Sequence, residues 1–332
     1  MPETRLSDVI VPTVFDPYVA ERSIHLNKFF QAGVLVQSPV LFEKLAGGSN
    51  TFNFPFWKDL SGDSEVLAEG SDMTVNAIAA DKMIARRQLR GKAWGANDLA
   101  AQLSGDNPIQ AIGDRVAQYW ATQYEKLLTL TVRGIIADNV ANDSSDLVVD
   151  ISIDTATSAT AANKISAEKT IDAVLKQGDH FSEVYAIAVH STVYATLLKN
   201  DLIDYVQDSR TNLLIPKYMG LNIVVDDDLP VIAITGGYKY HSYLFKQGAI
   251  AFAENPGKYV ANEAYRDPKG IGVDSLYTRR QFCIHPLGFS WVKSADTDTA
   301  TSPSNDDLSA AESWNRVYNA KNAGVIALIS NG

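Results

Sequence analysis

The sequence contains very little cysteine and no excess of basic residues. Of its 332 residues only one, Cys283, is a cysteine, which excludes an intrachain disulfide and a cysteine-based zinc site. The formal net charge is −10, from 29 Lys and Arg against 39 Asp and Glu. A protein that attracts nucleic acid by its overall field has the opposite sign. Any contact with DNA must therefore come from a local basic strip.

Long apolar runs and targeting segments are also missing. The uncharged apolar runs at 229–238 and 323–330 are far shorter than the roughly 20 residues that cross a bilayer. The first ten residues carry Glu3, Arg5 and Asp8 and lack the apolar stretch of a secretion signal. We therefore expect a cytoplasmic protein with no membrane partner.

The motifs of the common catalytic classes are absent as well. The chain has no glycine-rich phosphate loop, no G-x-S-x-G motif and no pair of histidines at the helical spacing of a metal site. The three aspartates at 226–228 suit a hard cation, but adjacent side chains converge poorly on one ion, so a solvated turn is expected. His190 beside Ser191 lacks a third orienting group, which favours a capping or core role, and Cys283 is expected in the core. The sequence predicts no catalytic residue, metal or cofactor.

The first hundred residues instead read as an arm followed by a ribbon. Four prolines within residues 1–48 predict an extended arm with one helix near 19–31. Residues 51–56 alternate strictly, which places three phenylalanines on one face of a strand. An acidic turn region at 59–72 follows, and a second extended stretch returns at 73–92 with a basic group. Because a two-stranded ribbon is marginal alone in water, we expect it to rest on another subunit.

The candidate subunit interface combines the aromatic residues of the first strand, the acids of the turn and the bases of the return. Its members are Phe52, Phe54, Phe56, Trp57, Asp59, Asp63, Glu65, Glu69, Asp72, Lys82, Arg86, Arg87, Arg90 and Lys92. The basic group permits three interpretations: pairing with acids of a neighbouring copy, contact with phosphates of packaged nucleic acid, or a merely solvated strand.

The rest of the chain predicts one long helix, a layered region and late strands. Apolar residues recur every three to four positions over 107–139, a helix of roughly 45 Å. Strands and helices alternate over 163–235 as in an α/β layer, with helices that begin near Ser166 and Ser191. The expected late strands are 240–245 and 248–252, which form one hairpin, and 276–284, 288–292 and 323–329.

The order of these pieces resembles that of the major capsid proteins of tailed double-stranded DNA bacteriophages, which have the HK97-like fold. Three stretches carry the likeness: 189–197 (VHSTVYATL), 218–230 (YMGLNIVVDDDLP) and 279–291 (RRQFCIHPLGFSW). The resemblance covers essentially the whole chain and implies an α+β fold. It implies an N-terminal arm at 1–48, an extended loop at 49–95, a peripheral domain at 96–162 with the spine helix 107–139, an axial domain at 163–235, further peripheral strands at 236–302, and a C-terminal segment at 303–332 that returns to the axial domain.

The resemblance also implies a structural protein without enzymatic activity. Such a protein assembles with copies of itself as hexamers and pentamers into an icosahedral head that encloses double-stranded DNA. The implied partners are a separate scaffolding protein and a portal during assembly in the host cytoplasm, the packaged DNA without sequence preference, and, as a further option, decoration proteins; the final location is the virion. The alternatives are an encapsulin-type nanocompartment shell and, from another class, a cytoplasmic α/β enzyme built on 163–235.

Overall fold

A computed structural model describes residue 22 and ten segments of the chain: 27–47, 49–57, 63–65, 80–97, 108–155, 159–207, 214–255, 262–267, 273–293 and 302–331. The helices are α3 (Lys28–Gln31), α4 (Pro39–Ala46), α6 (Pro108–Asn142), α7 (Ala167–Val174), α8 (Ser191–Lys199) and α9 (Asn305–Ser309), with short 3-10 helices η2 (Ala161–Asn163), η3 (Leu175–Glu183), η4 (Ala311–Ser313) and η5 (Ala320–Asn322). The strands are β1 (Leu35–Gln37), β2 (Thr51–Trp57), β3 (Ala80–Arg86), β4 (Gln88–Asn97), β5 (Val148–Asp150), β6 (Val184–Val189), β7 (Asp204–Gln207), β8 (Leu214–Tyr218), β9 (Leu221–Val225), β10 (Val231–Ile234), β11 (Gly237–Lys246), β12 (Ile250–Glu254), β13 (Asn262–Asp267), β14 (Val273–Pro286), β15 (Phe289–Trp291), β16 (Trp314–Arg316) and β17 (Val325–Ser330).

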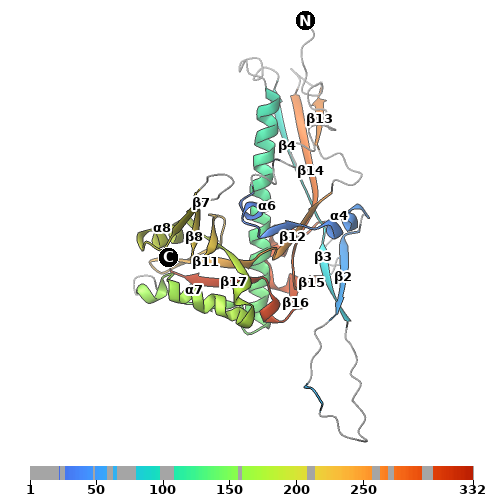
Figure 1. Ribbon diagram of the computed structural model, residues 1–332. Coiled ribbons are helices and arrows are strands. Elements are labelled where there is room, and N and C mark those ends of the chain that lie inside the picture. Colours follow the sequence, from blue (N-terminus) through green and yellow to red (C-terminus); the bar gives the residue numbers. More distant parts are fainter. Residues whose placement is uncertain are drawn as a thin grey trace, which may run out of the picture.

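Helix α6 is the axis to which the other layers attach (Figure 1). It has 35 residues, and at 1.5 Å per residue it is about 52 Å long. Its bounds agree closely with the helix predicted over 107–139, because buried side chains such as Val116, Trp120 and Tyr124 recur every fourth position. No helix of the described segments combines the length and apolar character needed to cross a membrane.

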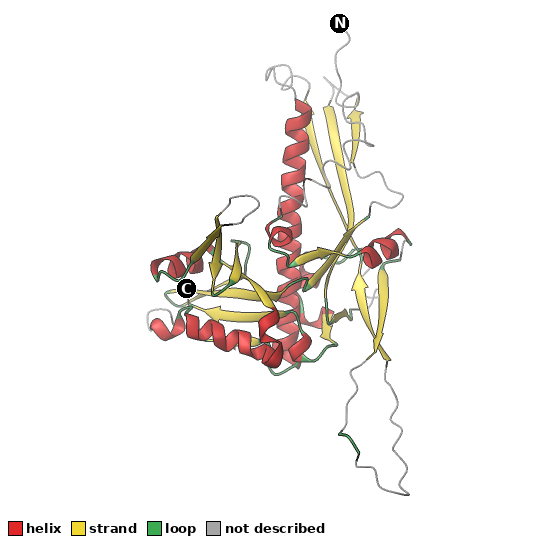
Figure 2. Ribbon diagram, in the orientation of Figure 1, coloured by secondary structure: helices red, strands yellow, loops and turns green. Residues whose placement is uncertain are grey.

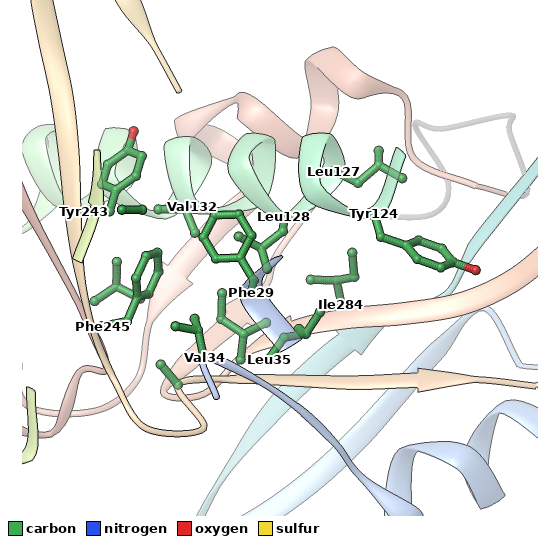
Figure 3. Close-up of a cluster of buried hydrophobic side chains, with 14 of the residues drawn as sticks. Phe29, Val34, Leu35, Tyr124, Leu127, Leu128, Val132, Tyr243, Phe245 and Ile284 are labelled. Carbon is green, nitrogen blue, oxygen red and sulfur yellow. The ribbon is translucent and has the colours of Figure 1, made fainter. Parts of the chain in front are cut away.

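An eight-stranded sheet forms one layer, in the order β5-β17-β11-β6-β9-β8-β7, with β10 paired to β11. Strands β6 and β9 are parallel, as the α/β reading of 163–235 predicts. One face buries Ile187 and Leu244 beneath α7 and α8, in one cluster with Ala173 and Val193. The opposite face packs on α6 with Tyr243 and Phe245 in the main core. Figure 3 shows these two rings beside α6, where Phe245 meets Phe29 edge-on at 6.0 Å.

The hairpin predicted from 240–245 and 248–252 is wrong. Both edges of β11 are taken by strands distant in sequence, β17 and β6, so β12 joins the other sheet, where it pairs with β14 and β1. Alternation identifies a strand but not its partner, and here the partners are non-local. Residues 237–246, expected among the peripheral strands, and β5, expected in the peripheral domain, therefore lie in the eight-stranded sheet.

A five-stranded sheet lies along the other part of α6 (Figure 2). Its central strand, β14, pairs with β12 and then β13 on one edge and with β4 on the other. Strand β1 pairs with β12, and helix α4 follows it, so residues 35–46 are not the extended arm that their proline suggested. Pro39 begins α4, where its missing amide hydrogen costs nothing, and the Ser38 hydroxyl accepts from the Leu41 amide at 3.4 Å.

A buried ion pair fixes α6 to this sheet. Arg280 of β14 donates to Glu254 of β12 at 3.0 Å, and their side chains are only 3% and 9% exposed. The Tyr124 hydroxyl of α6 donates to the second Glu254 oxygen at 2.9 Å. The Arg280 guanidinium also lies over the Trp120 ring, 5.8 Å from its centroid. The burial of Tyr124 and the nearby Glu254 carboxylate raise the pKa of this phenol well above its usual value, so it remains a donor.

The other end of α6 is covered by α9, η4 and the small β15–β16 sheet. Of the C-terminal segment predicted at 303–332, β17 lies in the eight-stranded sheet, whereas α9, η4 and β16 lie against α6. Gly134 permits the close approach: a Cβ atom there would lie 2.2 Å from the Leu308 carbonyl oxygen and 2.7 Å from Trp314 Nε1. The same indole donates to the Leu308 carbonyl at 2.8 Å.

Candidate subunit interface

Strands β2 and β3 form a two-stranded ribbon with a register from Thr51 opposite Arg86 to Trp57 opposite Ala80. As predicted, the phenylalanines share a face, because the residues between them are exposed. That face packs on its own subunit, however. Phe52 is 4% exposed among Leu41 and Leu45 of α4 and small residues of β12, in a cluster that Phe54 also contacts.

The ring contacts extend this packing along the ribbon. Phe54 stacks on His285 with ring centroids 6.1 Å apart, and Phe56 meets Tyr318 edge-on at 5.1 Å. Phe52 is thus covered by its own subunit, whereas Phe54 and Phe56 stay half-buried, and the contact of the aromatic face with a neighbouring copy stays a prediction. The sequence shows which residues share a face, but the residues that cover it come from α4, β12 and β14.

The opposite face of the ribbon carries the exposed aromatic. Trp57 is 70% exposed, the largest exposed fraction among the large hydrophobic side chains of the described residues. Lys82 on β3 is exposed as well. Of the predicted acids, Asp63 and Glu65 are exposed, whereas Asp59, Glu69 and Asp72 lie outside the described residues.

The predicted basic strip does not form one surface. Arg86 and Arg87 are 4% and 7% exposed, and the Arg87 guanidinium donates to the Asn50 side-chain oxygen. Arg90 donates to the Pro303 carbonyl at 2.7 Å, and burial lowers the pKa of this guanidinium. The reason is that the chain leaves the ribbon at Arg87 and enters the five-stranded sheet as β4. Lys82 on β3 and Lys92 on β4 remain exposed.

A second set of exposed apolar side chains lies on the eight-stranded-sheet layer, and sequence reasoning missed it. On α7 and η3 the set comprises Ile171, Leu175 and Phe181, which are 44%, 53% and 51% exposed. At the other end of the sheet, Tyr205 and Val206 of β7 are 54% and 45% exposed. The signal that would have found the first group is the spacing of Ile171 and Leu175, which lie four residues apart on the helix side away from the buried Thr170 and Ala173.

The solvated turn expected at 226–228 is confirmed for Asp227 and Asp228, which are exposed, but not for Asp226. Asp226 is 5% exposed, its carboxylate accepts from the Asp228 amide at 3.0 Å, and its burial raises its pKa. The exposed Asp227 accepts from the Ser191 amide at 3.1 Å, and the pKa of Asp227 is lowered by hydrogen bonds from Ser191, first from its side chain and then from this amide. Among the described residues no group of three or more His, Cys, Asp or Glu side chains is arranged to hold a metal.

The expectations for His190 and Cys283 are confirmed. The His190 ring accepts from the Thr192 amide at 3.2 Å and caps α8. Cys283 is fully buried beneath the ribbon and is therefore a core residue. Its burial raises the pKa of its thiol to about 12.

A long helix flanked by a mixed sheet, a ribbon and a second layered sheet defines the class of HK97-like phage capsid proteins. The structure of the Ralstonia phage GP4 capsid protein is similar with a TM-score of 0.56 at 10% identity, covering 85% of this chain and 84% of that one. The capsid protein of cyanophage Pam1 is similar with a TM-score of 0.57 at 8% identity, covering 93% of both chains. At these identities the likeness shows the fold.

Sequence similarity shows the family. The profile described as "Major capsid protein 13-like" matches residues 104–326. The major capsid protein of Bacillus phage SPP1 is 39% identical over 329 residues, which is 98% of each chain. The chain belongs to the Major capsid protein 13-like family.

Membership of this family decides between the classes that the sequence left open. The chain is a phage major capsid protein, a virion component that assembles into a multimeric lattice, and its relatives are structural proteins. The nanocompartment and the enzyme are not favoured.

Proposed function

We propose that this major capsid protein closes into hexamers and pentamers of an icosahedral head, and that the ribbon contacts the neighbouring copy. The exposed Trp57 carries this proposal, because its inward-facing neighbours already pack on their own subunit. An aromatic side chain that is 70% exposed on a ribbon end is a natural anchor for a second surface. Lys82, on the same ribbon as Trp57, and the exposed acids Asp63 and Glu65 supply charges of both signs.

The eight-stranded-sheet layer is proposed as the axial domain. Its two ends expose different apolar groups, at Ile171 and Leu175 on one side and at Tyr205 and Val206 on the other. Two different surfaces on one subunit allow a head-to-tail contact, in which one end of a copy binds the other end of the next. Such contacts close into a ring when a whole number of subunits completes a full turn. In this division the arm ends before β1, the ribbon belongs to the extended loop, and α6 with the five-stranded sheet forms the peripheral domain.

The proposal includes further partners on the strength of family membership. Assembly takes place in the host cytoplasm with a scaffolding protein and a portal, the finished head encloses double-stranded DNA, and decoration proteins are a further option. None of these partners requires a cofactor or a catalytic residue.

Deletion of residues 59–72 tests the ribbon contact. The deleted chain is expected to stay folded by circular dichroism yet to form no shells in electron micrographs. A matched control replaces the same residues with a glycine–serine linker of equal length, which retains the ribbon ends and removes only the side chains. Shells of normal size from the deletion variant would contradict the proposal, whereas shells from the linker variant alone would confine the contact to the ribbon end that carries Trp57 and Lys82.

A further inference from the structure

From residue 115 onward, the part of α6 whose side chains the structure describes, the exposed side of the helix carries charge of one sign. Between residues 115 and 142 the helix has five charged residues: Arg115, Glu125, Lys126, Arg133 and Asp138. Both acids are buried, with exposed fractions of 9% for Glu125 and 1% for Asp138, whereas all three bases are exposed. Within the described part of the chain no carboxylate forms an ion pair with any of the three bases. A protein with a net charge of −10 thus concentrates positive charge on one helix face.

Helical geometry places the three bases in one row. Lys126 follows Arg115 by eleven residues and Arg133 follows Lys126 by seven, so at about 100° per residue all three side chains leave the helix within about 20° of one line. The row, here called the basic line, extends about 27 Å at 1.5 Å per residue. Its spacing is held by the packing of the opposite helix face in the main core.

The fully exposed residues between the bases are polar. Between Arg115 and Lys126, Gln118 and Thr122 are exposed and Tyr119 is half-buried; Leu130, between Lys126 and Arg133, is also half-buried. The Tyr119 ring already packs edge-on against Trp94 and Trp120 of its own subunit, so the basic line lacks the free apolar or aromatic centre of protein–protein interfaces. Surfaces that bind DNA are more polar and strongly positive. The chemistry therefore fits a polyanion better than a second protein.

We propose that the basic line, formed by Arg115, Lys126 and Arg133, contacts phosphates of the double-stranded DNA inside the shell without sequence preference. The inference rests on the proposed function, because DNA is enclosed only if the chain forms a head, and it requires this side of α6 to face the interior of that head. Arginine guanidinium groups bind phosphate oxygens in pairs, and lysine acts as a point charge. Three contacts release few counterions, so each copy binds weakly, and the many copies of a shell add their effects.

The test measures DNA binding by the full-length unassembled chain. The probe is a mixed-sequence duplex of about 30 base pairs, followed by fluorescence anisotropy over a range of salt concentrations. Three contacts predict that log K falls against log salt with a slope of about −2.7. The triple variant Arg115→Gln, Lys126→Gln and Arg133→Gln is expected to bind at least tenfold more weakly at low salt.

The control variant removes the same charge from exposed lysines elsewhere: Lys164→Gln, Lys176→Gln and Lys199→Gln. It is expected to bind the duplex nearly as well as the unmodified chain. The proposal is overturned if the first triple variant keeps the original affinity and slope, or if the control loses as much. It is also overturned if the unmodified chain ignores the duplex but binds polyglutamate, which would make the line a site for an acidic protein.

Electron microscopy of the same preparations separates this inference from the proposed function. Shells formed by the basic-line variant, together with weakened DNA binding, support both. Shells together with unchanged DNA binding overturn only the inference. Failure of the unmodified chain to form shells even when it is produced together with its scaffolding protein contradicts the proposed function, while the DNA-binding data of the unassembled chain still decide the role of the basic line.

Discussion

Replacement of Gly134 by alanine is expected to destabilise the subunit, although alanine is the better helix former. In an exposed helix the change gains about 1 kcal/mol. Here the new methyl group would meet the Leu308 carbonyl oxygen at 2.2 Å and the Trp314 indole at 2.7 Å. The first contact is with backbone, so α6 and α9 must separate. Overpacking of this kind costs about 1–3 kcal/mol, and displacement of the indole from its carbonyl acceptor costs about 1 more.

The net expectation is therefore a loss of about 2 kcal/mol for Gly134→Ala. Urea unfolding of the unassembled subunit, followed by far-ultraviolet circular dichroism, measures it as a lower midpoint. The control Ala137→Gly, one turn later at a partly exposed position, measures the contribution of helix propensity alone. It is expected to lower the free energy of unfolding by about 1 kcal/mol. If Gly134→Ala matched or exceeded the stability of the unmodified chain, the close approach of α6 to α9 would be refuted.

Three further predictions concern the sheet and the ribbon. Arg280→Met leaves the buried Glu254 carboxylate without its partner and is expected to lower the free energy of unfolding in urea by roughly 3–5 kcal/mol. Adding Glu254→Leu should restore much of this free energy. Equal losses in the single and the double variant would argue against the ion pair. Burial lowers the pKa of His285 from 6.5 to about 4, so the unfolded state binds the proton more readily than the folded state. The free energy of unfolding should therefore fall by roughly 3 kcal/mol as the pH drops from above 6.5 to below 4. Urea unfolding at several pH values should show a smaller decrease for His285→Leu and an unchanged decrease for Cys283→Val. Trp57→Ala is expected to weaken each subunit contact by about 2–3 kcal/mol without altering subunit stability, and light scattering that detects unchanged assembly would contradict this.

Signals in the local sequence predicted the helices, whose backbone hydrogen bonds join residues that are close in sequence. The period of apolar residues identified α6, and the Ser166 and His190 caps identified the starts of α7 and α8, where each side chain accepts an amide hydrogen bond. Pro39 misled because proline is as suitable in the first turn of a helix as in an extended arm. Strand pairing was harder: nothing near β11 reveals that β17, some eighty residues later, occupies its edge.

In the candidate interface too, the sequence predicted what depends on neighbouring residues and missed what depends on distant ones. The alternation of residues 51–57 correctly grouped the phenylalanines, but a period does not say whether a face is covered by the same chain or by another copy. The cover for Phe52 comes from Leu41 and Leu45, on a helix that the sequence did not predict. Arg86 and Arg87 were grouped with Lys92 by charge alone, and burial separates them. The contact of Trp57 and Lys82 with a neighbouring copy stays a prediction.

The position of β17 has a consequence for the quality of the subunits that enter a shell. This strand fills the gap between β5 and β11, with Ala327 opposite Val148 on one side and Tyr243 on the other. A polypeptide that stops before residue 325 leaves two unpaired strand edges in the middle of its core, and unpaired edges recruit foreign strands. We therefore expect a chain truncated before β17 to aggregate rather than to fold into a subunit that can join a shell.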